Sequence, residues 1–385
     1  PYATNLLAGL GAEVIKVEPP WGERGRKLGP HRGADASTRP PADRGGLFAY
    51  LNTDKYGVTL NLKHDRGRAL LLELLGDADL LVENFAPATL PSLGLNPADL
   101  LERFARLSIV SISNFGQDGA DRDTRLNDLT LFARGGWTYA VGEPERAPLT
   151  PPGSLAQYVG GLYGAIGAIQ ALFARNFGDG GGQQVDVSLL EATVATMVYD
   201  PVTFQYTGSL RRRAGKRFAV GPFFIATLKC RDGYAGIHNV TQKQFEGLCG
   251  LMGAPQLARD ARFATPLARM ANNDALLEIC ERFCAEHERA WLYREGQRRA
   301  LPIVPIPTIA EVLEWEQTRA RKYFETIEDP ALGRIRIPGT PLRLSHAGAP
   351  SRPAPRLGEH NRAILGGRLG VDEAALGQLR EDGTV

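Results

Sequence analysis

Short apolar strands alternate with helical stretches along the first half of the chain, and this alternation limits the fold more than any other feature. The expected strands are residues 12–18, 58–62, 78–83, 107–113 and 184–188. An apolar-faced helix is expected over 66–75, and a second helix over 155–175. Strands separated by helices of this length indicate an α/β fold with a doubly wound, mostly parallel, Rossmann-like sheet.

Two aromatic turns lie where ligands of such a sheet bind, beyond the carboxyl ends of the strands. They are Asn84-Phe85 and Asn114-Phe115. A phenylalanine ring in this position can stack on a nucleobase or line an acyl pocket, and it can equally cover the end of the sheet. The residues alone leave both interpretations open for each turn.

The helix expected over 155–175 contains four glycines at positions 160, 161, 164 and 167. Each glycine inside a helix costs roughly 0.5–1 kcal/mol relative to alanine. Four of them therefore indicate that a backbone or a ligand approaches closely. Tight packing against another element and close approach of a ligand are both consistent with this pattern.

The sequence changes character after residue 200, and two domains are predicted. Residues 1–205 and 320–385 form the large domain, and residues 206–319 form a smaller α+β domain with its linkers. Residues 201–222 lack clean periodicity and are interpreted as a linker. A hairpin is expected over 224–238, a helix over 309–321, and a frayed tail at the carboxyl end.

Charge and cysteine content exclude several classes of protein. Lys and Arg number 45 against 43 Asp and Glu, which argues against a nucleic-acid or membrane-surface protein. No apolar run approaches the roughly 20 residues that span a bilayer. The four cysteines lack zinc-site spacing, so a reducing, cytoplasmic setting is expected. Because Tyr2 already lies inside an expected helix, we expect an upstream segment to be missing.

A collinear set of motifs resembles one known family. The set comprises Gly11-Ala-Glu-Val-Ile-Lys-Val-Glu-Pro-Pro20, Gly22-Glu-Arg-Gly-Arg26, Asn52-Thr-Asp-Lys55, Leu60-Asn-Leu-Lys63, Val82-Glu-Asn-Phe85, Ser113-Asn-Phe-Gly-Gln-Asp-Gly119, Asp128, Gly181-Gly-Gln-Gln-Val-Asp-Val-Ser188 and Leu357-Gly-Glu-His360. In this order they resemble the CaiB/BaiF family, the class III coenzyme A transferases. The resemblance covers nearly the whole chain.

The resemblance implies a function and a set of binding residues. Such a protein moves coenzyme A between an acyl-CoA thioester and a carboxylic acid, so its substrates are those two molecules and it holds no tightly bound cofactor. Arg26, Lys63, Asn84 and Phe85 fall at positions where the family contacts coenzyme A, since Arg and Lys pair with phosphates. The family also implies an interlocked homodimer.

Gln157 departs from the family pattern, because the transferases carry their acylated aspartate at this position. An amide oxygen is a far poorer nucleophile than a carboxylate. The racemase branch uses a histidine and an aspartate as bases, and these positions hold Asn127 and Gln157 here, so two-base racemisation is disfavoured. Asp128 matches a family aspartate and is a candidate helix cap.

Several mechanisms and classes remain open at Gln157. Asp128, Glu143 or direct attack by the acceptor acid could replace the missing nucleophile, and the Gln157 amide could hold a thioester oxygen. Alternatively, the chain is a catalytically silent binding module, paired with an aspartate-bearing sister subunit. A nicotinamide oxidoreductase is disfavoured, because no Gly-x-Gly-x-x-Gly follows a strand.

Overall fold

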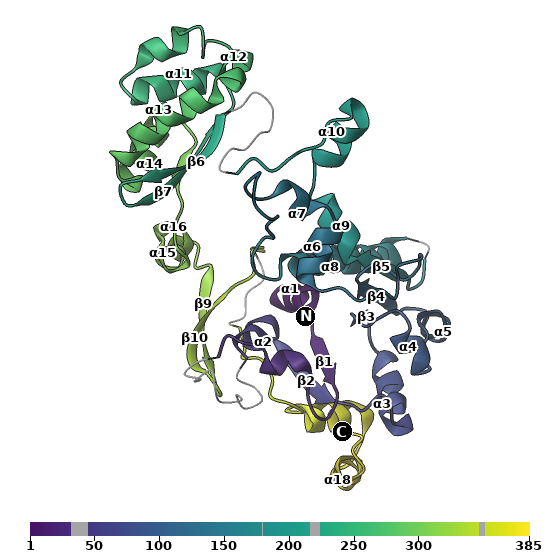
Figure 1. Cartoon of the computed structure of the whole chain (residues 1–385). Helices are drawn as coiled ribbons and strands as arrows, with labels where there is room; N and C mark the ends of the chain where they lie inside the picture. The colour runs from purple at the N-terminus through teal and green to yellow at the C-terminus, as the bar shows by residue number, and fades with distance from the viewer. Residues whose placement is uncertain (32–44, 179, 216–223, 346–350) are drawn as a thin grey trace. The chain divides into compact units, whose positions relative to one another are not determined.

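The computed structural model describes residues 1–31, 45–178, 180–215, 224–345 and 351–385. Its chain divides into two compact units. The first unit contains residues 1–135, 151–198 and 316–385, and the second contains residues 136–150 and 199–315. Figure 1 shows their elements. The observed divisions after Val198 and Trp315 lie near the predicted domain ends at 205 and 319, and residues 136–150 group with the second unit.

Parallel strands form two sheets in the first unit. Strand β1 (Val14–Glu18) pairs with β2 (Lys55–Thr59), and a three-stranded sheet has the order β3 (Leu80–Glu83), β4 (Ser108–Ser113), β5 (Gln184–Ser188). Every pair among these five strands is parallel. The mixed α/β class with parallel sheets is thus confirmed. Among the described residues, however, the strands form two separate sheets, where we expected one.

Successive residues of β4 face two different cores. Ile109 packs with Leu107 in a cluster that includes Leu70 of α3 (Asp65–Leu75), and Val110 packs with Ala168 in another. Alternation of side chains along a strand produces this division. The first unit also contains α1 (Tyr2–Gly9), η1 (Arg24–Lys27), α2 (Gly46–Leu51), α4 (Thr89–Ser92), α5 (Pro97–Arg103), α6 (Asp128–Arg134), α9 (Leu189–Ala195) and α16 (Glu316–Ala320).

Helix α8 (Leu155–Phe177) packs against α1, β4 and β5 through its glycines. A methyl group on Gly164 would lie 2.6 Å from Ile112 Cδ1, and one on Gly167 would lie 2.7 Å from Val185 Cγ1. A methyl on Gly161 would lie 3.0 Å from Tyr2 Cβ. Close packing of the helix on protein atoms therefore accounts for these glycines, the first of the two interpretations.

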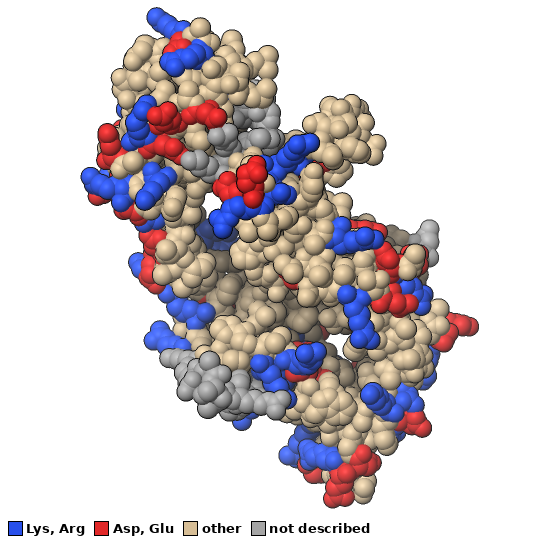
Figure 2. Space-filling view, viewed as in Figure 1, with Lys and Arg blue, Asp and Glu red and all other residues tan. Residues whose placement is uncertain are grey.

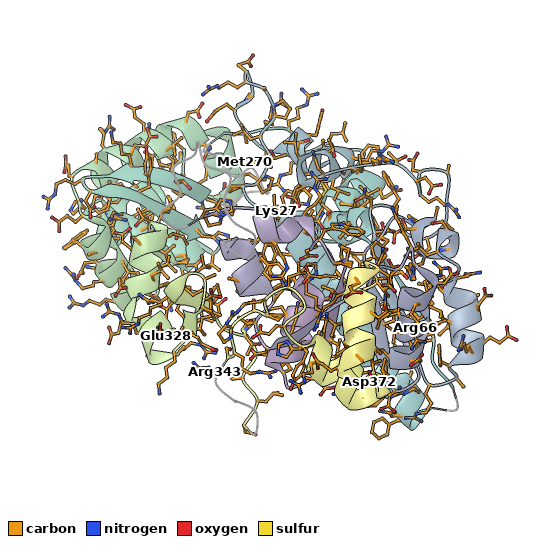
Figure 3. The ribbon with its side chains drawn as sticks, turned by 90° about the horizontal axis from the view of Figure 1, so that it is seen from below. Lys27, Arg66, Met270, Glu328, Arg343 and Asp372 are labelled. Atoms are coloured by element: carbon orange, nitrogen blue, oxygen red, sulfur yellow. The ribbon has the colours of Figure 1, made fainter. Side chains whose placement is uncertain are left out.

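The carboxyl-terminal segment is folded into the first unit, so the prediction of a frayed tail is wrong. It forms a π-helical turn η3 (Arg362–Gly366), α17 (Gly367–Leu369) and α18 (Glu373–Glu381). The side chain of Asp372, labelled in Figure 3, caps the amino terminus of α18. Leu376 and Thr384 are fully buried. The Thr384 carbonyl accepts a hydrogen bond from the Asn61 N–H at 2.8 Å. The tail is ordered because it fills part of a hydrophobic core.

The same segment forms hydrogen bonds to β2 through His360, the last residue of the Leu357–His360 motif, and through Asn361. The Gly57 N–H donates to His360 Nδ1 at 3.1 Å, and the His360 N–H donates to the Gly57 carbonyl at 2.9 Å. The Thr59 N–H donates to Asn361 Oδ1 at 2.8 Å. The Leu357–His360 motif thus has a structural role, which is to bind the strand.

The second unit contains an antiparallel sheet covered by helices. Its strands are β6 (Phe224–Cys230), β7 (Gly233–Asn239) and β8 (Ile303–Pro305), so the predicted hairpin is confirmed. Its helices are α7 (Trp137–Ala140), α10 (Asp200–Thr207), α11 (Gln242–Leu251), η2 (Pro255–Arg259), α12 (Pro266–Ala271), α13 (Asn273–Ala285), α14 (Arg289–Arg298) and α15 (Ile309–Glu314). All four cysteines are free and buried in this unit's core.

Two local predictions near the unit boundaries are wrong. The expected linker begins with a helix, α10, and its residues 216–222 lie outside the described residues. The expected helix 309–321 is interrupted at Trp315, whose ψ of 134° is extended backbone, and the units divide there. After α16, β9 (Phe324–Asp329) and β10 (Gly333–Pro338) form an antiparallel hairpin.

Candidate active site

Gln157 lies in the first turn of α8, and its side chain is exposed. Ser154 precedes this helix but makes no capping hydrogen bond through its side chain. Instead, the Gln157 N–H donates to Asp128 Oδ1 at 3.3 Å, and the Ala156 N–H also bonds to this carboxylate. A carboxylate is favourable at a helix amino terminus, where unpaired N–H groups converge. Asp128 therefore caps α8 in place of Ser154.

Hydrogen bonds join the tip of β4 to the loop before α6, the helix that Asp128 begins. Asn114 Nδ2 donates to the carbonyls of Thr124 and Leu126 at 3.3 and 3.4 Å. Asn127 then begins α6 with a capping box, in which its side chain accepts from the Thr130 N–H at 3.0 Å. The Asn114 side chain therefore fixes the loop before α6, and Asn127 serves as a helix cap.

Burial raises the pKa of Asp128, while its hydrogen bonds from Gln157 and Ala156 oppose the rise. The carboxylate stands directly beside the helix turn that carries Gln157. The predicted helix cap at Asp128 is therefore present. The helix that it caps is α8, and Asp128 and Gln157 are 29 residues apart in the sequence.

The Asn84-Phe85 turn follows β3 and presents its aromatic ring to solvent, with Phe85 44% exposed. The Phe85 N–H donates to Glu83 Oε2 at 2.7 Å. Glu83 itself is buried, and Ser111 also bonds to its carboxylate. A ring on a fixed turn at the carboxyl edge of a parallel sheet is suited to stacking on a flat ligand.

A second carboxylate fixes the other aromatic turn. Asp186 Oδ2 accepts from the Gln117 N–H at 2.8 Å, two residues beyond Phe115. Gly116 has φ +92°, and a methyl group there would lie 3.1 Å from the same oxygen. Sequence reasoning missed Glu83 and Asp186 as site residues. The signal that could have found Asp186 is a charged residue inside the apolar run Val185-Asp-Val187.

The two predicted phosphate-binding cations are placed very differently. Lys63 is exposed and follows β2, where its N–H bonds to Asn61 Oδ1. Arg26 is only 1% exposed, and its guanidinium pairs with Glu18 at 2.6 Å. The guanidinium also lies 4.1 Å from the centroid of the Phe48 ring. The structure thus gives Arg26 a buried ion pair at the end of β1.

Glu143, the other candidate nucleophile, belongs to the second unit. Its carboxylate lies against Gly215, and its backbone carbonyl accepts from Arg213 at 3.3 Å. Gln157 and Asp128 belong to the first unit. Of the two candidate nucleophiles, Asp128 is the one that bonds to the Gln157 backbone in the part of the chain that the structure describes.

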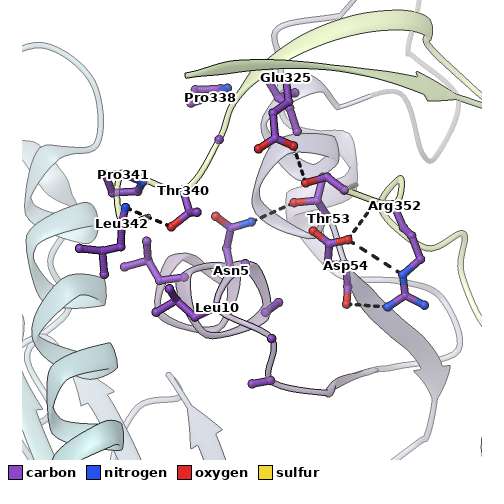
Figure 4. Close-up of a pocket in the computed structure, with 18 of the residues that line it drawn as sticks. Asn5, Leu10, Thr53, Asp54, Glu325, Pro338, Thr340, Pro341, Leu342 and Arg352 are labelled. Carbon is purple, nitrogen blue, oxygen red and sulfur yellow. Dashed lines mark hydrogen bonds and ion pairs between the residues drawn. The ribbon is translucent and has the colours of Figure 1, made fainter. Parts of the chain in front are cut away.

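A pocket of about 810 Å³ opens elsewhere in the first unit (Figure 4). Its walls include Asn5, Thr53, Asp54, Glu325 and Arg352, and Arg352 donates its N–H to Asp54 Oδ1 at 2.6 Å. None of the five predicted site residues lines it. The pocket is therefore distinct from the strand-edge site.

Figure 2 shows positive and negative side chains interspersed on the visible face. In the described ranges, no helix is both long and apolar enough to cross a membrane. Those ranges also hold no group of three or more His, Cys, Asp or Glu side chains arranged for a metal ion.

Comparisons with known proteins identify the family of the chain. The model of "CoA-transferase family III" matches residues 1–361. Acetyl-CoA:oxalate CoA-transferase of Acetobacter aceti is 33% identical, over 94% of this chain and 90% of that protein. The beta subunit of succinyl-CoA–L-malate CoA-transferase of Chloroflexus aurantiacus is 31% identical, over 99% and 93%. A CaiB/BaiF family crystal structure from Brucella suis has a TM-score of 0.82 and 30% identity, and the match covers 95% and 94% of the two chains.

The chain belongs to CoA-transferase family III. The family resemblance seen in the sequence motifs is thereby confirmed, and the relatives carry the names of acyl-CoA:acid CoA-transferases. These names favour a transferase over a catalytically silent binding module.

Proposed function

We propose that this protein transfers coenzyme A from an acyl-CoA thioester to a carboxylic acid. One observation carries the proposal within its family. Gln157, which the sequence motifs predict to take the position of the family nucleophile, is exposed on the first turn of α8, where its backbone N–H bonds to Asp128. A ligand that meets this turn meets the side-chain amide of Gln157.

Direct attack by the acceptor acid suits this arrangement. The acceptor carboxylate attacks the thioester carbonyl, the thiolate of coenzyme A leaves, and an anhydride between the two acids forms. The thiolate then attacks the acceptor's carbonyl, which yields the new thioester and releases the donor acid. The Gln157 Nε2–H₂ group donates to the oxyanion that forms in each attack, a role that is worth about 2.7–4 kcal/mol in other enzymes.

The strand edge binds the coenzyme A portion in this proposal. Phe85 stacks on the adenine, Asn84 supplies hydrogen bonds, and the exposed Lys63 pairs with a phosphate. Arg26 contributes indirectly, because its buried ion pair with Glu18 fixes the end of β1. Coenzyme A enters and leaves as a substrate, so the protein needs no tightly bound cofactor for this reaction.

We further propose a cytoplasmic homodimer. Apolar side chains recur at three- or four-residue spacing along α8 and remain exposed. They are Leu162, Ile166, Ile169, Phe173 and Phe177, each at least 46% exposed. A continuous apolar stripe of this kind on a soluble domain indicates a protein interface. The heteromer with an aspartate-bearing subunit remains the alternative, since one relative is a beta subunit.

Isotope transfer tests both the activity and its mechanism. The full chain is mixed with an unlabelled acyl-CoA and an acceptor acid labelled with ¹⁸O in its carboxylate. Mass spectrometry then measures the ¹⁸O content of the new thioester and of the released donor acid. Direct attack places one ¹⁸O from the acceptor in the released donor acid within a single turnover. If no new thioester forms above a heat-killed control, the proposed activity is wrong. If thioester forms but the donor acid lacks the label, an enzyme carboxylate takes part.

The variant Gln157→Asp provides the complementary test. We expect it to exchange through an acyl-enzyme, because a carboxylate at this position can form a mixed anhydride and then an enzyme thioester. Incubation with acyl-CoA and hydroxylamine should inactivate this variant and spare the wild type. The control is Gln157→Asn, which keeps an amide and should remain resistant.

A further inference from the structure

One row of side chains crosses the carboxyl edge of the β3–β4–β5 sheet. Glu83 of β3 is opposite Ser111 of β4, and Ser111 is opposite Asp186 of β5. Side chains in one cross-strand row project from the same face of a sheet. The row therefore places two carboxylates on either side of a serine hydroxyl, and Ser111 bonds to Glu83.

Each carboxylate of the row receives a backbone N–H from an aromatic turn. Glu83 Oε2 accepts from Phe85 at 2.7 Å, within its own turn. Asp186 Oδ2 accepts from Gln117 at 2.8 Å, across to the loop that follows β4. Charge-assisted hydrogen bonds of this length are roughly twice as strong as neutral ones. The two turns are thus tied to one rigid element.

We propose that the Glu83–Ser111–Asp186 row is a positioning element for coenzyme A, which fixes the turn that presents Phe85 before the ligand arrives. This inference rests on the proposed binding of coenzyme A at that turn. The Phe85 side chain is 44% exposed, so packing of its ring holds the turn only in part. Without the row, binding would have to order the turn, and affinity falls by the cost of that ordering.

Two nearby polar atoms support a ligand at this edge. Among the described residues, the buried Ser113 Oγ and Gln117 Nε2 have no hydrogen-bond partner. Ser113 lies two residues beyond Ser111 on β4, and Gln117 is the residue whose N–H Asp186 holds. Buried polar atoms are nearly always paired in proteins, so unpaired ones at a strand edge indicate a partner that binds there.

A pair of variants at Glu83 distinguishes the loss of the hydrogen-bond acceptor from a change in side-chain size. Glu83→Gln keeps an oxygen that accepts the Phe85 N–H, whereas Glu83→Met has a similar length and no such acceptor. Titration calorimetry with free coenzyme A should show affinity about tenfold weaker for the Met variant, and within about threefold of wild type for the Gln variant. In the transfer assay, the Met variant should raise KM for acyl-CoA and leave kcat within about twofold.

Two reference variants make the result decisive. Phe85→Ala reports whether the turn binds coenzyme A. Glu102→Ala removes an exposed carboxylate of α5 outside the row and should leave the affinity unchanged. Weak binding by Phe85→Ala with unchanged binding by Glu83→Met would overturn the positioning role alone. Equal weakening by Gln and Met at residue 83 would also overturn it. A wild type without affinity for coenzyme A would instead defeat the proposed function, and the inference with it.

Asp186 gives an independent pair at an exposed position, in case Glu83→Met does not fold. Asp186→Asn keeps an acceptor for the Gln117 N–H, and Asp186→Ala removes it. The Ala variant should bind coenzyme A more weakly than the Asn variant. Equal affinities of Asn and Ala variants would contradict a role for the row.

Discussion

Gln157 is the residue on which the proposed mechanism depends, because the sequence motifs predict a nucleophilic aspartate at its position. The motif order predicted its position on a helix, and the structure places it in that helix's first turn. The sequence did not predict that Asp128 would cap the same helix, because the two residues are far apart in the chain and their contact depends on how α6 and α8 pack. Contacts of this kind come from tertiary structure and have no local pattern.

Asp128 should be replaceable by Asn but not by Ala. Asn is as good a helix cap as Asp, so Asp128→Asn should keep the bonds from Ala156 and Gln157. Asp128→Ala should lower the free energy of unfolding by about 1 kcal/mol, measured by urea denaturation. The transfer activity should follow the same order. An inactive but fully stable Asn variant would show instead that Asp128 acts as the missing nucleophile.

Glu83 should make stability depend on pH. Burial raises its pKa, hydrogen bonds from Ser111 and Phe85 oppose the rise, and the Asp186 charge adds to it. Because the folded-state pKa is raised, Glu83 contributes its full stabilisation below the pKa of an unfolded glutamate, about 4.3. This contribution is lost as the pH rises through the folded-state pKa. The free energy of unfolding of Glu83→Gln relative to wild type should therefore increase from pH 4 to pH 7. Glu102→Gln is the matched control, and an equal trend there would contradict the assignment.

At the scale of elements, apolar periodicity predicted the strands better than it predicted their limits. Strand β2 was expected over 58–62 and lies at Lys55–Thr59. The strand begins earlier than expected because Lys55 belongs to it. Lys55 is 4% exposed, and its Nζ–H groups donate to the Leu51 carbonyl at 2.7 Å and to Asn52 Oδ1 at 3.0 Å. A buried lysine that finds its partners in the preceding turn does not look like part of a strand in the sequence.

The glycines of α8 can be tested against a glycine in open space. Gly164→Ala should lower the free energy of unfolding by about 1–3 kcal/mol, because its methyl would lie 2.6 Å from Ile112 Cδ1 in a close-packed core. Gly377→Ala in α18 meets nothing within 4 Å and should raise it by about 0.5–1 kcal/mol through helix propensity. Thermal denaturation of both variants decides the matter, and a stabilised Gly164→Ala would mean that α8 does not pack as described.

At the scale of the whole molecule, the proposed dimer predicts a mass and a sensitive surface. Sedimentation should give twice the 41.8 kDa of one chain. Ile169→Glu places a charge in the apolar stripe of α8 and should shift the protein toward monomer, because a buried unpaired charge is costly. Gln378→Glu adds the same charge on the exposed surface of α18 and should leave the mass unchanged. A monomeric wild type would contradict the dimer.

Composition could not predict the division into units. The change of character after residue 200 gave an approximate boundary, yet residues 136–150, which were expected in the large domain, join the second unit. The linker also looked irregular where α10 forms, since a short helix with exposed apolar side chains has no clear amphipathic pattern. Membership of a unit depends on tertiary contacts, which the local secondary-structure propensity of a segment does not specify.

The bonds between β2 and the carboxyl-terminal segment have a consequence for biosynthesis. Gly57 and Thr59 find partners 303 and 302 residues later, and His64 meets Thr384 across 320 residues. On the ribosome, the backbone groups of β2 must therefore wait until residues 360 and 361 have emerged before they find these partners. Loop closure over such separations is slow, and unpaired strands invite aggregation in the meantime. Nascent chains of this protein are thus expected to need chaperone protection until the segment that pairs with β2 has emerged.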